Sequence, residues 1–347
     1  MTVTPAVHAP PTTRGPGGPG GSGSPGGSGG LGGRWTRFAL RRGGRLLVSL
    51  FVLVTAAFVM IHLVPGDPVR AALGMTAPTE LVEARRQALG LDDPLLTQYL
   101  DYLGGLFRGD LGESIQTQLP VGETIGRRLG ATVSLGLIAF ALALLIAVPL
   151  GVAVAVATRR GRRQRTSLGF ASSSVVIGSI PDFLIGVVLV AVFAVGLGWF
   201  PVAGREDGAA SYVLPVLALA IGPAAMLARI VRVEMISVLE SDYIRTARAK
   251  RLPARRIHLV HALPNAVTAT LTLGGMLLAS MVAGTVLVEN VFAWPGLGST
   301  IVSSIVTKDY PVVQGTVLVY GVIVLVVNTL VDVALALLDP RSTVGEA

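Results

Sequence analysis

Six long apolar stretches dominate the sequence. They cover residues 46–64, 131–157, 168–198, 212–231, 268–288 and 312–335. Each stretch is long enough to cross the roughly 30 Å hydrocarbon core of a bilayer as an α-helix. The pattern therefore predicts an all-α membrane protein with six transmembrane helices. Pro181 interrupts the third stretch, which we expect to form one kinked or tilted helix rather than two passes.

The composition agrees with a membrane protein. Hydrophobic residues make up 52% of the chain and charged residues 14%, with a mean hydropathy of +0.69. This balance excludes an ordinary soluble domain. The absence of cysteine excludes disulfides, iron–sulfur clusters and thiol nucleophiles. Apart from the pair His258 and His261, the four histidines are too scattered to predict a metal cluster, and we expect no cofactor.

Basic residues predict how the chain is oriented. Five arginines and no acidic residue lie from Arg34 to Arg45, directly before the first stretch, and five more lie from Arg159 to Arg165. A third basic segment, Arg229 to Arg256, follows the fourth stretch. Because lysine and arginine accumulate in cytoplasmic loops, both termini are expected in the cytoplasm. No aromatic residue lies within the Arg159–Arg165 run, so it indicates a topology anchor and not a nucleic-acid site.

The chain divides into five regions. A Gly/Pro/Ser-rich tail, expected to be disordered, is followed by a basic flank with the first span, an external loop with short helices, the membrane core and a short C-terminal tail. These regions are residues 1–33, 34–64, 65–129, 130–342 and 343–347, with the longest cytoplasmic loop at 232–267.

The external loop contains two predicted helices. One spans Thr79–Leu89, with Thr79 as N-cap and Gly90 at C′, and the other starts after Asp93 with Pro94 as its first residue. The second helix carries an apolar stripe that needs a partner surface: Leu95, Leu96, Tyr99, Leu100, Leu103, Leu106 and Phe107. This stripe indicates a lid on the protein's own external ends, contact with an external protein, or both.

The cytoplasmic loop reads as a helix-turn-helix over residues 240–264. Helix-favouring residues continue to Lys250, Pro253 stops them, and a second helical stretch covers Ala254–Leu263. This segment resembles the EAA loop of permease subunits of ATP-binding-cassette importers, in the branch for dipeptides, oligopeptides and nickel. The Glu-Ala-Ala positions of that pattern fall on Arg245, Thr246 and Ala247, and its terminal Leu-Pro on Leu263 and Pro264.

Two positions differ from the family pattern. Arg251 replaces the turn glycine and His261 replaces an isoleucine. Because glycine adopts a positive φ without a steric penalty, Arg251 predicts either a strained turn, at about 1 kcal/mol, or a different turn.

The resemblance extends from residue 34 to about residue 342. It includes several further motifs, among them Pro65-Gly66-Asp67-Pro68, Leu89-Gly90-Leu91-Asp92-Asp93-Pro94, Gly109-Asp110-Leu111-Gly112, Trp199-Phe200-Pro201-Val202, Phe292-Ala293-Trp294-Pro295-Gly296-Leu297-Gly298, Asp309-Tyr310-Pro311-Val312-Val313-Gln314-Gly315 and Leu338-Asp339-Pro340-Arg341.

The resemblance implies a type I ABC importer permease fold in the cell membrane. It implies a pore shared with a second homologous permease subunit, two cytoplasmic ATPase subunits and an extracytoplasmic solute-binding protein. The residues that it assigns to ATPase coupling are Asp242, Tyr243, Arg245, Thr246, Ala247, Ala249, Lys250, Arg251, Leu263 and Pro264. Peptide is the expected substrate, with nickel or another small solute as the alternative.

The chain lacks the Gly-x-x-x-x-Gly-Lys-Ser/Thr pattern that cradles ATP phosphates. ATP hydrolysis is therefore expected in partner subunits and not in this chain. An ion-coupled secondary transporter is the rival, but the only acids found within the apolar stretches are Asp182 and Asp332. No Ser-His, paired-Asp or HExxH arrangement within the spans supports an intramembrane enzyme.

Individual polar residues leave alternatives open. Asp182 either accepts backbone N–H groups freed by the Pro181 break or lines the pore. Asp332 is expected to be wetted or paired, and His62 to be an interfacial residue and not a ligand. His258 and His261 are expected to face one side of the docking helix as contact residues.

Overall fold

The structure, a computed structural model, describes residues 31–63, 67–74, 76–161 and 163–338. Within these ranges the chain is helical, and its extended pairing is limited to one isolated bridge between Glu113 and Pro120. Most of the predicted N-terminal tail and the whole C-terminal tail lie outside the described residues. Helix α1 begins at Leu31.

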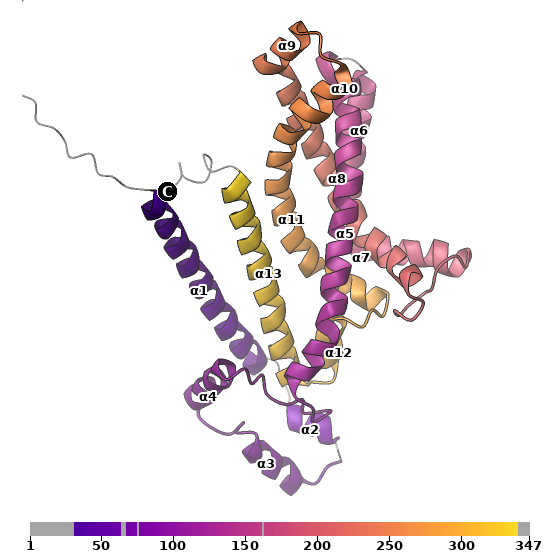
Figure 1. Cartoon of the computed structure of the whole chain (residues 1–347). Helices are drawn as coiled ribbons and strands as arrows, with labels where there is room; N and C mark the ends of the chain where they lie inside the picture. Colours follow the sequence, from indigo (N-terminus) through magenta and orange to yellow (C-terminus); the bar gives the residue numbers. More distant parts are fainter. Residues whose placement is uncertain (1–30, 64–66, 75, 162, 339–347) are drawn as a thin grey trace, which may run out of the picture.

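Five helices are long and apolar enough to span a membrane, and they form an elongated bundle (Figure 1). They are α1 (Leu31–Leu63), α5 (Val121–Thr158), α8 (Ala209–Glu240), α11 (Leu263–Val291) and α13 (Tyr310–Leu338). Helices α5 and α8 extend beyond the predicted spans because their charged end turns, although too polar to count as membrane sequence, continue the helix.

The sixth predicted span is broken. Helix α6 (Gln164–Gly178) meets α7 (Asp182–Leu189), which continues into the π-helical segment η2 (Val190–Gly196), at an angle of 90°. Pro181 is the N-cap of α7, and the Ser179 N–H and hydroxyl both donate to the Val175 carbonyl. The break was predicted at the right residue, but a kinked or tilted helix was wrong: the chain turns a corner. Counted as one span, the pair completes the six.

Helix α5 packs on α8 through a stripe of small residues. Every fourth side chain of α5 is buried along this stripe: Ala131, Leu135, Ala139, Ala143, Ala147, Gly151 and Ala155. A Cβ at Gly151 would stand 2.6 Å from the Ala228 carbonyl oxygen. Small residues allow the two helices to approach this closely. Because lipid provides no hydrophobic driving force between helices, van der Waals packing at this contact stabilises the pair.

Helix α1 packs against α13 at the side of the bundle. Leu53 lies against Gly321, and Arg42 forms an ion pair with Asp332. The prediction that Asp332 is a wetted or paired group is thus confirmed by its partner. Only 11% of the apolar window of α1 is buried, so most of this helix faces outward.

Short helices gather at both ends of the bundle. One end, here called the α4 end, carries α2 (Pro68–Leu73), α3 (Thr79–Ala88) and α4 (Leu95–Phe107). The opposite α9 end carries α9 (Asp242–Ala249), α10 (Ala254–Arg256) and the π-helical segment η3 (Ile257–Ala262), with the 3-10 turn η1 (Arg159–Gly161) beside them. Helix α12 (Leu297–Val306) lies between α11 and α13.

The predicted helix starts at the α4 end were off by one residue. Pro78 and Pro94, and not Thr79, occupy the N-cap positions of α3 and α4, and neither cap forms a side-chain hydrogen bond. Both prolines have φ near their fixed value, which suits the residue that enters a helix. Gly90, with φ +63°, takes the left-handed position after α3 as predicted.

Candidate functional site

Helix α9 begins at the end of α8 and is short. Its N-cap is Ser241, whose hydroxyl donates to the Val238 carbonyl and thus does not cap α9 itself. Asp242 places a carboxylate in the first turn, where the positive end of the helix dipole stabilises it. The predicted loop 232–267 is shorter in the structure, because α8 continues to Glu240 and α11 begins at Leu263.

The turn after α9 is a Schellman motif. The Leu252 N–H donates to the Ala247 carbonyl at 3.3 Å, and the Arg251 N–H donates to the Arg248 carbonyl at 2.9 Å. Arg251 occupies the C′ position with φ +55°. That position favours glycine, so of the two predicted possibilities the strained turn is the one that the structure contains.

The inner face of α9 is anchored in a hydrophobic cluster. Ile244 and Ala247 are buried, and Leu252 packs against the same cluster from the turn. The other members come from α5, α8, η3 and α11: Ala155, Met235, Leu239, Ile257, Ala262 and Ala266. The Arg248 guanidinium also donates to the Leu239 carbonyl at 2.9 Å. Helix α9 is therefore fixed to the ends of three long helices.

The outer face of α9 is polar and open. The side chains of Asp242 and Arg245 are 93% and 75% exposed and form an i,i+3 pair at 3.1 Å. Tyr243, Thr246, Ala249, Lys250 and Arg251 are also exposed. Most of the sequence-predicted coupling residues thus share one open surface. Ala247 does not, because it is buried in the cluster that supports the helix.

Leu263 and Pro264 lie at the start of α11, beside α9. Leu263 is half-buried and Pro264 exposed. Asn265 connects this region to α9 by donating to the Tyr243 hydroxyl at 3.1 Å and to the His261 carbonyl at 2.9 Å. The second arm of the predicted helix-turn-helix is therefore continuous with α11.

The two histidines of this arm have different surroundings. Burial, together with the nearby positive charges of Arg159 and Arg248, lowers the pKa of His258, which favours its neutral form at pH 7. The His261 ring lies 3.3 Å from the Arg256 carbonyl. His258 thus faces inward, toward the arginines, and is not part of the open surface of α9.

Asp182 lies at the corner between α6 and α7. Its carboxylate oxygens would stand 3.2 Å and 3.3 Å from Cβ atoms added to Gly222 of α8 and Gly284 of α11. Helix α7 has no side-chain cap, and among the described residues no hydrogen bond reaches this carboxylate. The favoured prediction, a carboxylate that accepts backbone N–H groups, is therefore not what the structure shows. Asp182 instead faces the space between α8 and α11.

Glu289 is a buried acid that the sequence reading missed. It is fully buried, and its carboxylate accepts hydrogen bonds from the Thr132 hydroxyl and the Gly298 N–H, both at 2.7 Å, and from the Ser299 N–H at 3.1 Å. The predicted span ended one residue earlier, so Glu289 was assigned to the following loop. The available signal was an acid shortly before a Pro-Gly turn and a new helix, which is typical of a carboxylate at a helix N-terminus.

Glu289 joins three helices. Its partners belong to α5 and to the first turn of α12, and the Thr132 hydroxyl also accepts from the Leu297 N–H at 2.8 Å. Trp294 adds a hydrogen bond from its indole N–H to the Ala131 carbonyl at 3.1 Å. Glu289 is therefore a further acidic residue within the spans, besides Asp182 and Asp332, which the sequence predicted.

Comparison with known proteins gives consistent matches along the chain. Residues 147–344 match the family described as binding-protein-dependent transport system inner membrane component, and residues 35–136 match its N-terminal domain. A glutathione transport system permease protein of Escherichia coli O6:H1 (strain CFT073) is 36% identical over 303 residues, which are 87% of this chain and 97% of the relative. A Brucella suis protein named for a peptide transport system permease is 36% identical over 313 residues, 88% and 98% of the two chains.

The fold itself is similar to that of a solved transporter. The inward-facing MetNI methionine ABC transporter superposes with a TM-score of 0.53 at 18% identity, covering 62% of this chain and 96% of the other. At this identity, the likeness concerns the fold alone.

Proposed function

This chain belongs to the family of binding-protein-dependent transport system inner membrane components, and from that premise we propose that it is the membrane permease subunit of an ATP-driven peptide importer. Relatives named for glutathione and peptide transport, aligned over nearly their whole length, support this substrate class. The family description names a binding protein. ATPase subunits, a solute-binding protein and a second permease subunit complete the proposed assembly.

The observation that carries the proposal is the construction of α9. Its buried face, Ile244 and Ala247, is fixed to the ends of α5, α8 and α11, whereas its outer face carries Asp242, Arg245 and Lys250 in the open. A short, exposed helix rigidly attached to long spans is suited to receive force from another subunit. We assign the outer face of α9 as the ATPase-docking surface.

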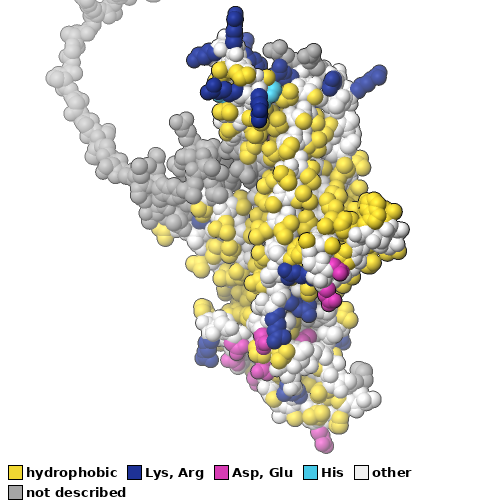
Figure 2. All heavy atoms as spheres, turned by 45° about the vertical axis from the view of Figure 1, so that its right-hand side comes forward, with side chains coloured by type: hydrophobic (Ala, Val, Ile, Leu, Met, Phe, Trp, Pro, Cys, Tyr) yellow, Lys and Arg dark blue, Asp and Glu magenta, His cyan; other side chains and the backbone are white. Residues whose placement is uncertain are grey.

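The distribution of charge supports the placement of this surface in the cytoplasm. Figure 2 shows a cluster of lysine and arginine side chains at the α9 end, a broad apolar surface below it, and acidic side chains mixed with further basic ones toward the other end. Arg159 and Arg165 belong to the same end as Arg245 and Arg256. The positive-inside rule supports assigning this end to the cytoplasm, as the sequence predicted for both termini.

Force on α9 has two routes into the membrane. One is the direct connection between Glu240 and Asp242 at the end of α8, and the other is η3, which is continuous with α11. Asp182 at the α6–α7 corner faces α8 and α11, so movement of these two helices changes its surroundings. ATP-driven closure of the ATPase pair would thus rock the spans and switch the pore between outward and inward access.

The test is a charge reversal on the outer face of α9. Arg245→Glu is expected to lower ATP-driven peptide uptake by at least about tenfold in vesicles, because it replaces an exposed cation with an anion at a charged interface. Arg165→Glu is the matched control: it makes the same change at an exposed position of the same end but outside α9. Uptake by Arg245→Glu equal to that of the control would contradict the assignment, as would unchanged uptake after deletion of residues 243–252.

A further inference from the structure

Helix α4 has an apolar face that the described parts of the chain leave exposed except at Leu103, which is half-buried. Leu96, Leu100, Leu103 and Phe107 follow the spacing i, i+4, i+7 and i+11, which places them in one row along the helix. Leu96, Leu100 and Phe107 are 69%, 57% and 90% exposed. Thr97 and Asp101 lie on a different, polar side of the helix.

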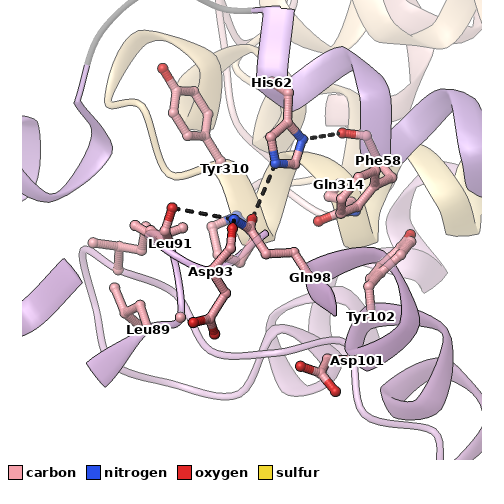
Figure 3. A pocket seen from close by; sticks show the side chains of 13 residues that line it. Phe58, His62, Leu89, Leu91, Asp93, Gln98, Asp101, Tyr102, Tyr310 and Gln314 are labelled. Atoms are coloured by element: carbon pink, nitrogen blue, oxygen red, sulfur yellow. Dashed lines mark hydrogen bonds between the residues drawn. The ribbon is translucent and has the colours of Figure 1, made fainter. Parts of the chain in front are cut away.

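A third side of α4 attaches it to the end of α1, and Figure 3 shows Gln98 and Tyr102 of α4 near His62 and Phe58 of α1. The Tyr99 and Thr55 hydroxyls are 2.8 Å apart, and the Tyr99 and Tyr102 rings lie 5.1 Å and 5.8 Å from the Phe58 ring. Gln98 contacts the His62 ring at 3.2 Å. The structure therefore shows that α4 packs against the end of α1, and that this contact uses only part of the apolar stripe.

These contacts fix the depth of α4 relative to the membrane. The apolar span of α1 covers Arg42–Met60, so Thr55 lies about 8 Å inside its end, at 1.5 Å per residue. His62 lies just beyond that end. A helix that touches both residues runs along the boundary between hydrocarbon and headgroups.

We propose that α4 is an interfacial membrane helix whose row Leu96, Leu100, Leu103 and Phe107 is immersed in the lipid of the external leaflet. Its polar side, with Thr97 and Asp101, faces water. The side chains of Tyr99 and Tyr102 combine an apolar ring with a polar hydroxyl, as is common at membrane interfaces. A helix with one apolar and one polar side, lying in the plane of the interface, satisfies both surroundings.

Lipid is favoured over a protein partner by continuity. The span of α1, to which α4 is attached, is almost wholly unburied and exposes Val59 and Met60 near the same level. The row of α4 thus lies next to the unburied apolar surface of a predicted membrane span. It contains no charged residue, and the exposed Arg108 directly after Phe107 supplies a cation near the level of lipid phosphates.

Single-cysteine labelling tests this placement cleanly because the natural chain contains no cysteine. Leu100→Cys and Phe107→Cys carry a polarity-sensitive fluorophore on the apolar row, and Thr97→Cys carries it on the polar side as a matched control. The assembled complex is reconstituted in phosphatidylethanolamine–phosphatidylglycerol vesicles. Each label is then quenched by a nitroxide lipid or by aqueous iodide.

The expected result is at least about twofold stronger lipid quenching at positions 100 and 107 than at position 97, with the opposite order for iodide. Two independent labelled positions keep the test valid if one variant fails to assemble. Equal iodide access at all three positions would overturn the proposal. So would protection of position 100 that arises only when a soluble binding protein is added, because that result would make the row a protein-docking surface.

Discussion

Arg251 adopts a conformation that its side chain disfavours. The two hydrogen bonds of the Schellman turn after α9 require a positive φ at this position, and an L-residue other than glycine pays for it sterically. The sequence therefore retains a strained residue at the tip of the proposed docking surface.

Replacing Arg251 with glycine is expected to stabilise the protein by about 0.5–1 kcal/mol, which corresponds to a rise in Tm of about 2 °C in detergent. Arg251→Ala keeps the strain and is expected to show no such gain. Lys250→Gly, one residue earlier with φ −74°, is expected to be neutral or destabilising. Equal Tm values for Arg251→Gly and Arg251→Ala would contradict backbone strain at this position.

Glu289 makes a second residue-level prediction. Glu289→Gln replaces one of two carboxylate oxygens, which together accept from the Gly298 and Ser299 N–H groups and the Thr132 hydroxyl, with an NH2 donor, and is expected to cost about 1–3 kcal/mol of stability. Glu289→Ala leaves all three donors without this acceptor and is expected to cost more. Glu240→Gln, at an exposed position, is the control. Thermal unfolding of Glu289→Gln that matches this control would show that the buried carboxylate is dispensable.

For single residues, the sequence predicted the features that depend on local sequence, but not the contacts between distant parts of the chain. The left-handed turn at Arg251 followed from the missing glycine, and the pairing of Asp332 from its position in a span. Burial of Ala247 was not foreseen, since a short helix with few apolar residues does not reveal which side packs. The network around Glu289 depends on Thr132, far away in the chain, and no local pattern indicates that contact.

At the level of elements, helices α5 and α8 form the most extensive contact among the described helices. A methyl group at Gly151 would overlap the Ala228 carbonyl and the Val231 side chain, whereas one at Gly126 of the same helix meets open space. Gly151→Ala is therefore expected to destabilise the protein by about 1–3 kcal/mol. Gly126→Ala is expected to be neutral or stabilising, because alanine favours helix. Equal unfolding temperatures for the two variants would contradict this packing.

The sequence predicted which segments form helices more readily than it predicted how those helices are arranged. Apolar length is a property of a segment, so the six spans and the short helices at both ends were predictable. The angle at the α6–α7 corner was not, because proline marks where a helix is interrupted while neighbouring helices decide how far the chain turns. Small residues recur at every fourth position of α5 in the sequence, but this pattern does not indicate that α8 is the helix that packs against them.

For the whole molecule, the separation of charge and the attachment of α9 together support the proposed importer. One end carries a cluster of basic residues and a rigidly held helix with an open polar face, and the other carries α2, α3 and α4 and most of the acidic side chains, together with further basic ones (Figure 2). The substrate and the partner subunits could not be derived from side-chain chemistry alone. They follow from family membership and from the relatives named for peptide transport.

Cross-linking from the outer face of α9 tests the central assignment most directly. Arg245→Cys, made in a chain that has no other cysteine, is treated with a short bifunctional reagent in the assembled transporter. Arg165→Cys provides the control at the same end. We predict that position 245 cross-links to an ATPase subunit, with a yield that changes when ATP is added, and that position 165 does not. An assembled, ATP-hydrolysing complex in which position 245 forms no such cross-link would contradict the docking role of α9.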